Sequence, residues 1–180
     1  MELYFIIIGI VLLILIIWYI STFNKIKTAN IKVEEAISGI DVALTKRYDV
    51  ITQMVEVVKG YAKHEQETLT KLIEIRKGMP ISEKNEANKI MSDNLHKINL
   101  LAESYPELKA SENFKTLQKA IMDVEEHLQA ARRCYNSNVT NFNELIITFP
   151  ASIVANKMKM VKKDFFEIEE SKKENVDIKI

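Results

Sequence analysis

The sequence predicts an all-α protein: one N-terminal transmembrane helix followed by an antiparallel up-and-down bundle of about four long helices. Three observations predict this class. An uncharged apolar run, residues 3–20, opens the chain. After it, apolar residues recur at steps of three and four, the spacing of one helix face. Only 4 glycines and 3 prolines occur in 180 residues, which is too few turn residues for a protein of many short strands.

Residues 3–20 are predicted to cross a membrane. As a helix they rise about 27 Å, close to the roughly 30 Å hydrocarbon core of a bilayer. Tyr4 at one end, with Trp18 and Tyr19 at the other, fits the aromatic belts of membrane interfaces. A cleaved signal peptide is the alternative, but no basic residue precedes the run and no small-residue cleavage pattern follows it. We therefore expect a retained anchor over residues 1–22.

The lysines near the span predict its orientation. Lys25, Lys27 and Lys32 follow the apolar run, and no Lys or Arg precedes it. Basic residues collect on the cytoplasmic side of a span. We therefore expect a single-pass protein of the cell membrane, with its N-terminus outside and its C-terminal body in the cytoplasm. Cys134 is the only cysteine, so no intrachain disulfide can form, which fits a reducing compartment.

Residues 23–170 are predicted to form one bundle domain. Its N-terminal half should consist of the first two helices. The first helix, with its stripe of apolar residues, should end at Gly78, and Pro80 beyond it should prevent the helix from continuing. The second helix should begin at Ser82 and end at Pro106. Its expected apolar face consists of Ala87, Ile90, Met91, Leu95, Ile98, Leu101 and Tyr105.

A third helix should begin near Ser111, a favourable N-cap, and end at Pro150. Its expected apolar face steps by three or four throughout: Phe114, Leu117, Ile121, Val124, Leu128, Ala131, Tyr135, Asn138, Phe142, Leu145 and Phe149. A fourth helix is indicated by Val154, Met158, Val161, Phe165 and Ile168. Residues 171–180 have no helical stripe and are expected to form a loosely ordered tail. Short connections between these helices favour antiparallel neighbours.

The predicted helix lengths leave the start of the first helix without an obvious partner. This stem contains Ile26, Val33, Ile37 and Ile40. An uncovered apolar stripe there suggests self-association or a partner helix. The alternative is a bend at Gly39 or Gly60 that changes the register.

The charges and motifs point away from nucleic acid, metal and cofactor. Lys+Arg and Asp+Glu each total 25, so the basic excess of a general nucleic-acid binder is missing. His64-Glu65 begins like the zinc motif H-E-x-x-H, but Thr68 stands at the second histidine position. His127 and Cys134 could share a helix face, yet two ligands do not make a zinc site. We expect no catalytic residues, no metal and no cofactor.

A basic run, residues 157–163, could contact lipid headgroups or an acidic partner. Its lysines lie off the expected apolar face, however, so a solvated surface is the favoured interpretation.

The unusual segment is 132–143, which is rich in asparagine although it is predicted to be helical. Asparagine is unfavourable inside helices because its side chain competes for backbone hydrogen bonds. The candidate site residues are Arg132, Asn136, Asn138 and Asn143. They are interpreted either as a buried polar layer that fixes one bundle arrangement or as a binding patch for a peptide or polar ligand.

Several ordered motifs resemble the LemA family of small membrane-anchored bacterial proteins. Residues 40–49 are similar to its I-D-x-x-L-x-x-R-x-D stretch, and residues 58–65 to its V-K-x-Y-x-x-H-E. Residues 105–110 match Y-P-x-L-K-A, and residues 131–136 match A-R-x-x-Y-N, followed by Phe142-Asn143 and Phe149-Pro150. The resemblance covers about residues 30–167. Thr52 stands where the family usually has proline.

The resemblance implies an N-terminal anchor, a cytoplasmic helical bundle and no established catalytic activity or agreed active site. It also implies an accessory role beside membrane metalloproteases of the heat-shock type. We therefore expect a non-enzymatic, membrane-tethered scaffold or adaptor whose partners are the lipid bilayer and other proteins. The alternative is a ligand- or stress-sensing accessory module for a membrane protease.

Overall fold

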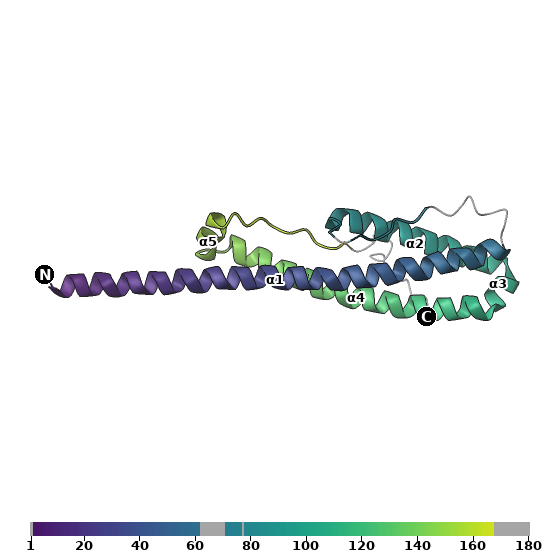
Figure 1. Ribbon diagram of the computed structural model, residues 1–180, viewed down its shortest axis with the longest axis horizontal. Coiled ribbons are helices and arrows are strands. Elements are labelled where there is room, and N and C mark those ends of the chain that lie inside the picture. Colours follow the sequence, from purple (N-terminus) through teal and green to yellow (C-terminus); the bar gives the residue numbers. More distant parts are fainter. Residues whose placement is uncertain (1, 62–70, 77, 168–180) are drawn as a thin grey trace, which may run out of the picture.

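The computed structural model describes residues 2–61, 71–76 and 78–167. Five helices follow one another within them: α1 (Glu2–Tyr61), α2 (Ile81–Ser104), α3 (Pro106–Ala110), α4 (Glu112–Ile147) and α5 (Ala151–Lys157). No strand occurs among these residues. Figure 1 shows α1 as one long rod with α4 lying along its second half and α2 beside both. The all-α class and the bundle arrangement are therefore confirmed.

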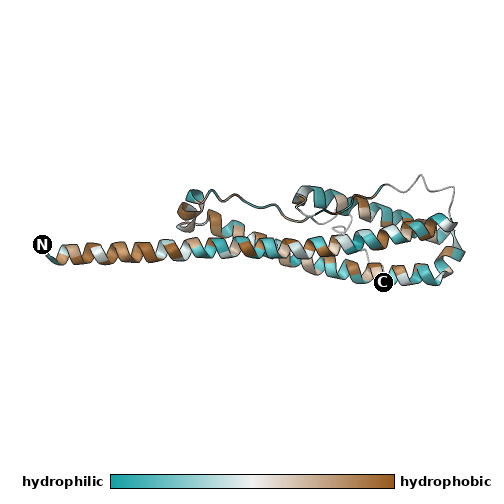
Figure 2. Cartoon of the chain, in the orientation of Figure 1, coloured by the Kyte–Doolittle hydropathy of each residue, from teal (hydrophilic) through white to brown (hydrophobic). Residues whose placement is uncertain are grey.

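The first part of α1 extends beyond the body of the protein. Its large apolar residues from Leu3 to Ile17 are all exposed, and none of its most apolar window is buried inside the structure. Figure 2 shows this stretch as an almost uniformly hydrophobic helix. It is long and apolar enough to cross a membrane. Because it is bare, it is not the core helix of a soluble domain.

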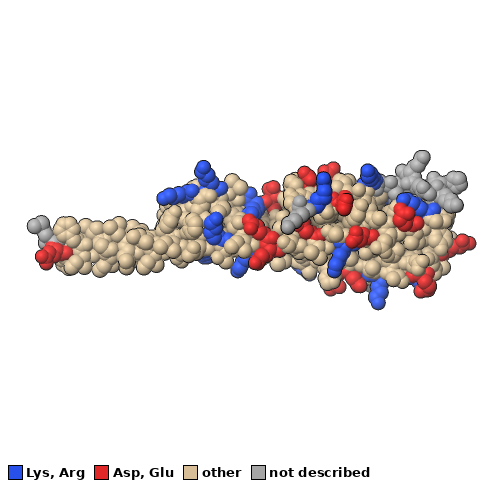
Figure 3. All heavy atoms as spheres, viewed as in Figure 1, with Lys and Arg blue, Asp and Glu red and all other residues tan. Residues whose placement is uncertain are grey.

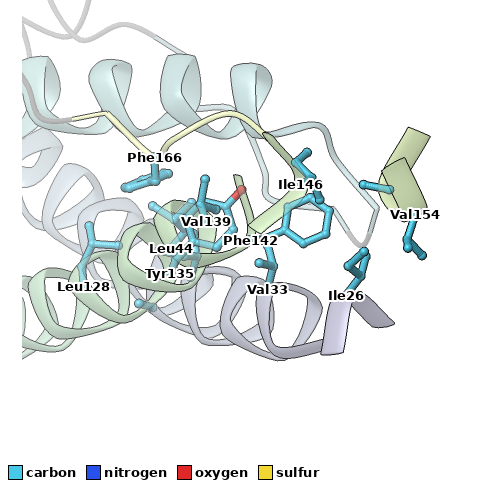
Figure 4. Packing of buried hydrophobic residues seen from close by; sticks show 13 residues of the cluster. Ile26, Val33, Leu44, Leu128, Tyr135, Val139, Phe142, Ile146, Val154 and Phe166 are labelled. Carbon is cyan, nitrogen blue, oxygen red and sulfur yellow. The ribbon is translucent and has the colours of Figure 1, made fainter. Parts of the chain in front are cut away.

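Two hydrophobic clusters form the core, and both contain residues of α1. The first joins α1 to the C-terminal half of α4, to α5 and to Phe166 (Figure 4). The second joins Ile51, Met54 and Val58 of α1 to α2, α3 and the N-terminal half of α4. The most extensive pairing is between α1 and α4. The two helices approach closely at Gly39, where an added Cβ would lie 3.8 Å from that of Ala131.

The stem of α1 is covered, so the prediction that it lacks a partner within the chain is wrong. Ile26, Val33 and Ile40 are 0%, 2% and 0% exposed. They pack against the end of α4 and against Val154 and Ala155 of α5. The prediction failed because α4 runs back along α1 for 36 residues and α5 extends the cover. The proposed register change at Gly39 is not needed, because α1 is one helix from Glu2 to Tyr61.

The predicted end of the first helix at Gly78 is also wrong. Within the described residues α1 ends at Tyr61, and residues 71–76 are not helical. Leu72, Ile73 and Ile75 are nevertheless half-buried against the core. Apolar side chains of a non-helical segment thus reproduced the spacing of a helix. Gly78 lies in the turn before α2 with φ of 80°, a conformation that favours glycine. His64 and Thr68 lie outside the described residues.

The predicted helix boundaries at Pro106 and Ser111 are confirmed. Pro106 ends α2 and begins α3, a five-residue helix that the sequence analysis missed. Proline is favoured at this first position because the amide it lacks would have no partner within the helix. Ser111 caps α4, with its hydroxyl accepting a hydrogen bond from the backbone N–H of Phe114 at 3.5 Å.

The fourth predicted helix is much shorter than expected. α5 ends at Lys157, Lys159 has φ of 54°, and residues 160–167 form an extended segment, which we call the strap. Val161 and Phe165 are exposed instead of forming a helix face, whereas Phe166 is 1% exposed. Phe149, expected in the core, is 78% exposed. Ile168 and the tail 171–180 lie outside the described residues.

Candidate functional site

Two of the four candidate residues hold the strap against α4. Asn136 and Asn143 are seven residues apart, so they project from one face of the helix. Each makes a reciprocal pair of hydrogen bonds with the strap backbone. Asn136 donates to the carbonyl of Phe166 and accepts from its N–H, both at 2.9 Å. Asn143 does the same with Lys163, again at 2.9 Å in both directions. The two side-chain amides thus take the place of a neighbouring β-strand.

Two further side chains support the strap. The hydroxyl of Tyr135 donates to the backbone carbonyl of Asp164 at 2.9 Å. Asn85 of α2 accepts from the N–H of Glu167 at 3.2 Å. Burial of Tyr135, with a smaller contribution from the negative charge of Asp164, raises the pKa of its phenol above 10.0. Figure 4 shows Phe166 of the strap on the side of Tyr135 and Val139. The strap therefore ties α2 to α4 and closes the first core cluster.

Arg132 and Asn138 are not part of this contact. Arg132 donates to Gln129 of the same helix at 3.0 Å. Asn138 donates to the carbonyl of Cys134, also within α4, at 3.0 Å. The expectation that Asn138 lies on the buried face of the helix is wrong, because Val139 takes that place with 0% exposure. The structure thus brings Asn136 and Asn143 together through the strap and leaves Arg132 and Asn138 elsewhere. A ligand-binding role for the four stays a prediction.

Asn138 lines an open groove between α1 and α4, about 380 Å³ in volume. The groove is lined by Lys32, Glu35, Ala36, Gly39, Ala131, Cys134 and Asn138. The cysteine is a free, exposed thiol. The lining includes Gly39 and Ala131, where the two helices approach closely. Neither Arg132 nor Asn136 belongs to this groove.

The principal buried polar network centres on Arg47, which the sequence analysis did not single out as a site. Arg47 is 1% exposed and lies between α1, α2 and α4. Its Nε donates to Glu125 Oε1 at 2.7 Å, and its Nη1 donates to the side-chain oxygen of Asn88 at 2.6 Å. Its Nη2 donates to the hydroxyl of Ser92 at 2.8 Å. Every nitrogen of the guanidinium is thus engaged by a neighbouring helix.

A second buried cation lies one helical turn from this network. Lys84 of α2 is 1% exposed, and its Nζ is 2.5 Å from the carboxylate of Asp41 on α1. Asp41 and Arg47 both belong to the stretch 40–49 that carries part of the family resemblance. That stretch was the one sequence feature that could have pointed to them. Their partners are 41 to 78 residues away in sequence, so no local spacing could reveal them. The arrangement is that of polar cross-links between helices.

Metal-ligating side chains are dispersed in the described part of the chain. Across residues 2–61, 71–76 and 78–167, no three His, Cys, Asp or Glu side chains lie together in a way that could hold a metal ion. His127 and Cys134 are both exposed on α4.

Comparison with known proteins identifies the family. The model of the LemA family matches residues 36–180. This chain belongs to the LemA family. A relative named Protein LemA, from Metamycoplasma hominis, is 29% identical over an alignment of 168 positions that covers 88% of this chain and 75% of the relative. The LemA match contains the Arg47 network, both strap-binding asparagines and the strap itself. It begins after the apolar part of α1, so it says nothing about the span.

Proposed function

We propose that this LemA family protein is a non-enzymatic scaffold or adaptor, tethered to the cell membrane by one span, that presents a helical bundle to partner proteins. In this proposal the N-terminus lies outside and the bundle lies in the cytoplasm. The contacts with partners involve the bundle surface, and the membrane fixes the place where they form.

The observation that carries the proposal is the continuity of α1. One helix contains both the bare apolar run and residues at the centre of both core clusters. Trp18, Tyr19 and Phe23 pack against the first cluster, so removal of the apolar run as a signal peptide would cut into the core contacts. An exposed apolar surface of this length is unusual in a soluble protein. A retained tether that continues directly into the bundle accounts for both features.

The buried polar groups support a structural rather than a catalytic role for the bundle. Arg47 is bonded to groups of α2 and α4, and Lys84 is paired with Asp41. If the helices shift, these buried groups lose the oppositely charged or hydrogen-bonding partners that they have in this arrangement. They therefore favour one arrangement of the bundle. A fixed outer surface is what a scaffold requires.

A sensing role is a second candidate, favoured by the groove beside Cys134. The groove is open, it combines charged and polar side chains with small apolar residues, and it contains an exposed thiol. In this version the protein would be an accessory module of a membrane protease, and occupation of the groove would alter the contact with that partner. Self-association is a weaker proposal. It was suggested by a stem of α1 expected to be uncovered, and that stem is buried within the chain.

In-cell photocrosslinking tests the scaffold proposal. A photoreactive amino acid is placed at exposed positions such as Met122 and Arg133, one at a time, in the full-length chain. A scaffold should give discrete adducts from one part of the surface. An unrelated apolar helix of the same length, substituted for residues 3–17, should preserve these adducts, whereas deletion of the span should abolish them.

Two results would contradict the proposal. The absence of discrete adducts from every surface position would exclude a stable protein partner. Adducts that persist after deletion of the span would show that the tether is irrelevant. If instead adducts form only beside Cys134 and change when the thiol is blocked, the sensing role is favoured.

A further inference from the structure

The end of the body nearest the candidate span has a distinct composition, and α5 forms much of it. Val154 and Ala155 of α5 pack in the same cluster as Ile26 of α1, and Trp18 and Tyr19 pack against that cluster. Lys157 Nζ lies 5.6 Å from the centroid of the Tyr19 ring. Figure 1 shows α5 beside α1 where the bare part of the long helix meets the body. We call this end, residues 147–163 with 20–32 of α1, the proximal cap.

The proximal cap is basic. Residues 3–33 contain three lysines, residues 145–163 contain four, and neither segment contains Asp or Glu. Figure 3 shows the consequence on the visible face, where the charged residues at this end of the body are Lys and Arg and the acidic residues of the body lie farther along it. The whole chain has a net charge of zero, so the positive charge is concentrated here and balanced elsewhere.

The proximal cap also exposes large apolar side chains among these lysines. Phe149 and Val161 are 78% and 76% exposed, more than any large apolar residue described in the span itself. Ile147 and Ile153 are 56% and 58% exposed. Neighbouring Val154 is fully buried, so α5 divides its apolar residues between the core and the outside. Exposed apolar groups flanked by lysines are typical of segments that lie in a membrane interface.

We propose that the proximal cap docks on the anionic headgroup layer of the membrane that α1 spans, as a second membrane contact beside the span. Phe149 and Ile153 enter the interface, and Lys157, Lys159 and Lys162 contact lipid phosphates. This inference rests on the proposed tether and adds to it a dependence on lipid charge. The docked cap holds the bundle at a fixed angle to the bilayer.

Position and charge together favour lipid over an acidic protein. Residues 3–20 fill the hydrocarbon core, so Tyr19 lies at its edge and its neighbour Lys157 lies at headgroup level. Lysines within a Debye length of an anionic leaflet are attracted to it. A surface already held at this depth meets headgroups before it meets any soluble partner.

The experiment measures the depth of the cap in vesicles. Ile153→Cys is made in a Cys134→Ser full-length chain and labelled with an environment-sensitive dye. The chain is reconstituted in phosphatidylcholine alone or mixed with phosphatidylglycerol, with a headgroup-region spin-labelled lipid as quencher. The dye at 153 should be quenched and blue-shifted in the anionic vesicles, and less so without phosphatidylglycerol or in high salt. The matched control, Met122→Cys on the distal part of α4, should be unquenched in both.

Charge removal provides the second arm. Lys159→Gln with Lys162→Gln should reduce the ratio of docked to free cap by about thirtyfold in anionic vesicles. The control pair Lys109→Gln with Lys119→Gln, exposed residues far from the cap, should leave quenching unchanged.

Three outcomes would overturn the inference. A dye at 153 as water-exposed as one at 122 means that the cap does not touch the membrane. Equal quenching with and without phosphatidylglycerol means that lipid charge is not recognised. Flotation of the vesicles distinguishes these results from failure of the tether, since a chain that does not float with the lipid refutes the proposed span itself and the docked cap with it.

Discussion

Replacement of Asn136 by alanine should release the strap from α4. The side chain makes two hydrogen bonds to the backbone of Phe166, both at 2.9 Å. A neutral hydrogen bond contributes about 0.5–1.5 kcal/mol net, so the pair contributes about 1–3 kcal/mol to closure of the strap. This corresponds to a roughly 5- to 140-fold increase in the open population. Asn143→Ala should act in the same way through its two bonds to Lys163.

Limited tryptic cleavage after Lys162 and Lys163 measures this opening in the detergent-solubilised full-length chain. When the strap opens and closes faster than it is cut, the cleavage rate follows the open population. Asn138→Ala is the matched control, because Asn138 bonds only within α4. It should leave the rate unchanged. Cleavage of Asn136→Ala at the wild-type rate, or equal acceleration by Asn138→Ala, would show that the Asn136 hydrogen bonds do not hold the strap closed.

The remaining predictions concern the buried groups. Arg47→Ala should lower the free energy of unfolding, measured by urea titration, by about 3–5 kcal/mol, because Glu125 loses its buried partner. Arg133→Ala, an exposed control on α4, should change the free energy of unfolding by less than about 0.5 kcal/mol. Equal effects would contradict the network. Tyr135→Phe should be less stable than wild type at neutral pH through loss of a hydrogen bond. Since the folded-state pKa of Tyr135 is raised, its stabilising contribution is complete below about pH 10 and is lost as pH rises toward the folded pKa. The stability difference between the two proteins should therefore narrow above about pH 10, and a constant difference there would refute the assigned cause.

Local signals predicted the boundaries of α2 and α4 well. Ser111 marks the start of α4 and Pro106 the end of α2, because capping and the missing proline N–H act within one helical turn. The bare apolar run was equally plain from its composition. These features depend on neighbours in sequence, which a reader of the sequence can see.

The strap could not be predicted because its structure is imposed from a distance. Val154, Met158, Val161 and Phe165 have helical spacing, yet the chain leaves the helix after Lys157. The backbone of the strap bonds to side chains 20 and 30 residues earlier in the chain. Those bonds outweigh a weak local preference for helix. The asparagine-rich segment drew attention for the right reason, since its side chains do compete for backbone groups, but the backbone belongs to another segment.

The Arg47 network is a second feature that could not be predicted from the sequence. Arginine and lysine are rarely buried without partners, so residue type alone favours exposed positions for Arg47 and Lys84. Their burial depends on Glu125, Asn88 and Asp41, which only the folded bundle brings near. The stretch 40–49, which carries part of the family resemblance, contains Asp41 and Arg47 but does not indicate which residues they bind.

The proposed function requires that α1 tether the bundle to the cell membrane with the bundle in the cytoplasm. Cysteine accessibility tests it most directly. Met122→Cys is placed in a Cys134→Ser full-length chain, where position 122 is exposed on α4, and intact cells are treated with a membrane-impermeant maleimide before alkali-washed membranes are collected. We expect the protein to stay in the washed membranes and to be labelled only after permeabilisation. Labelling in intact cells, or loss of the protein from the washed membranes, would contradict the proposed function.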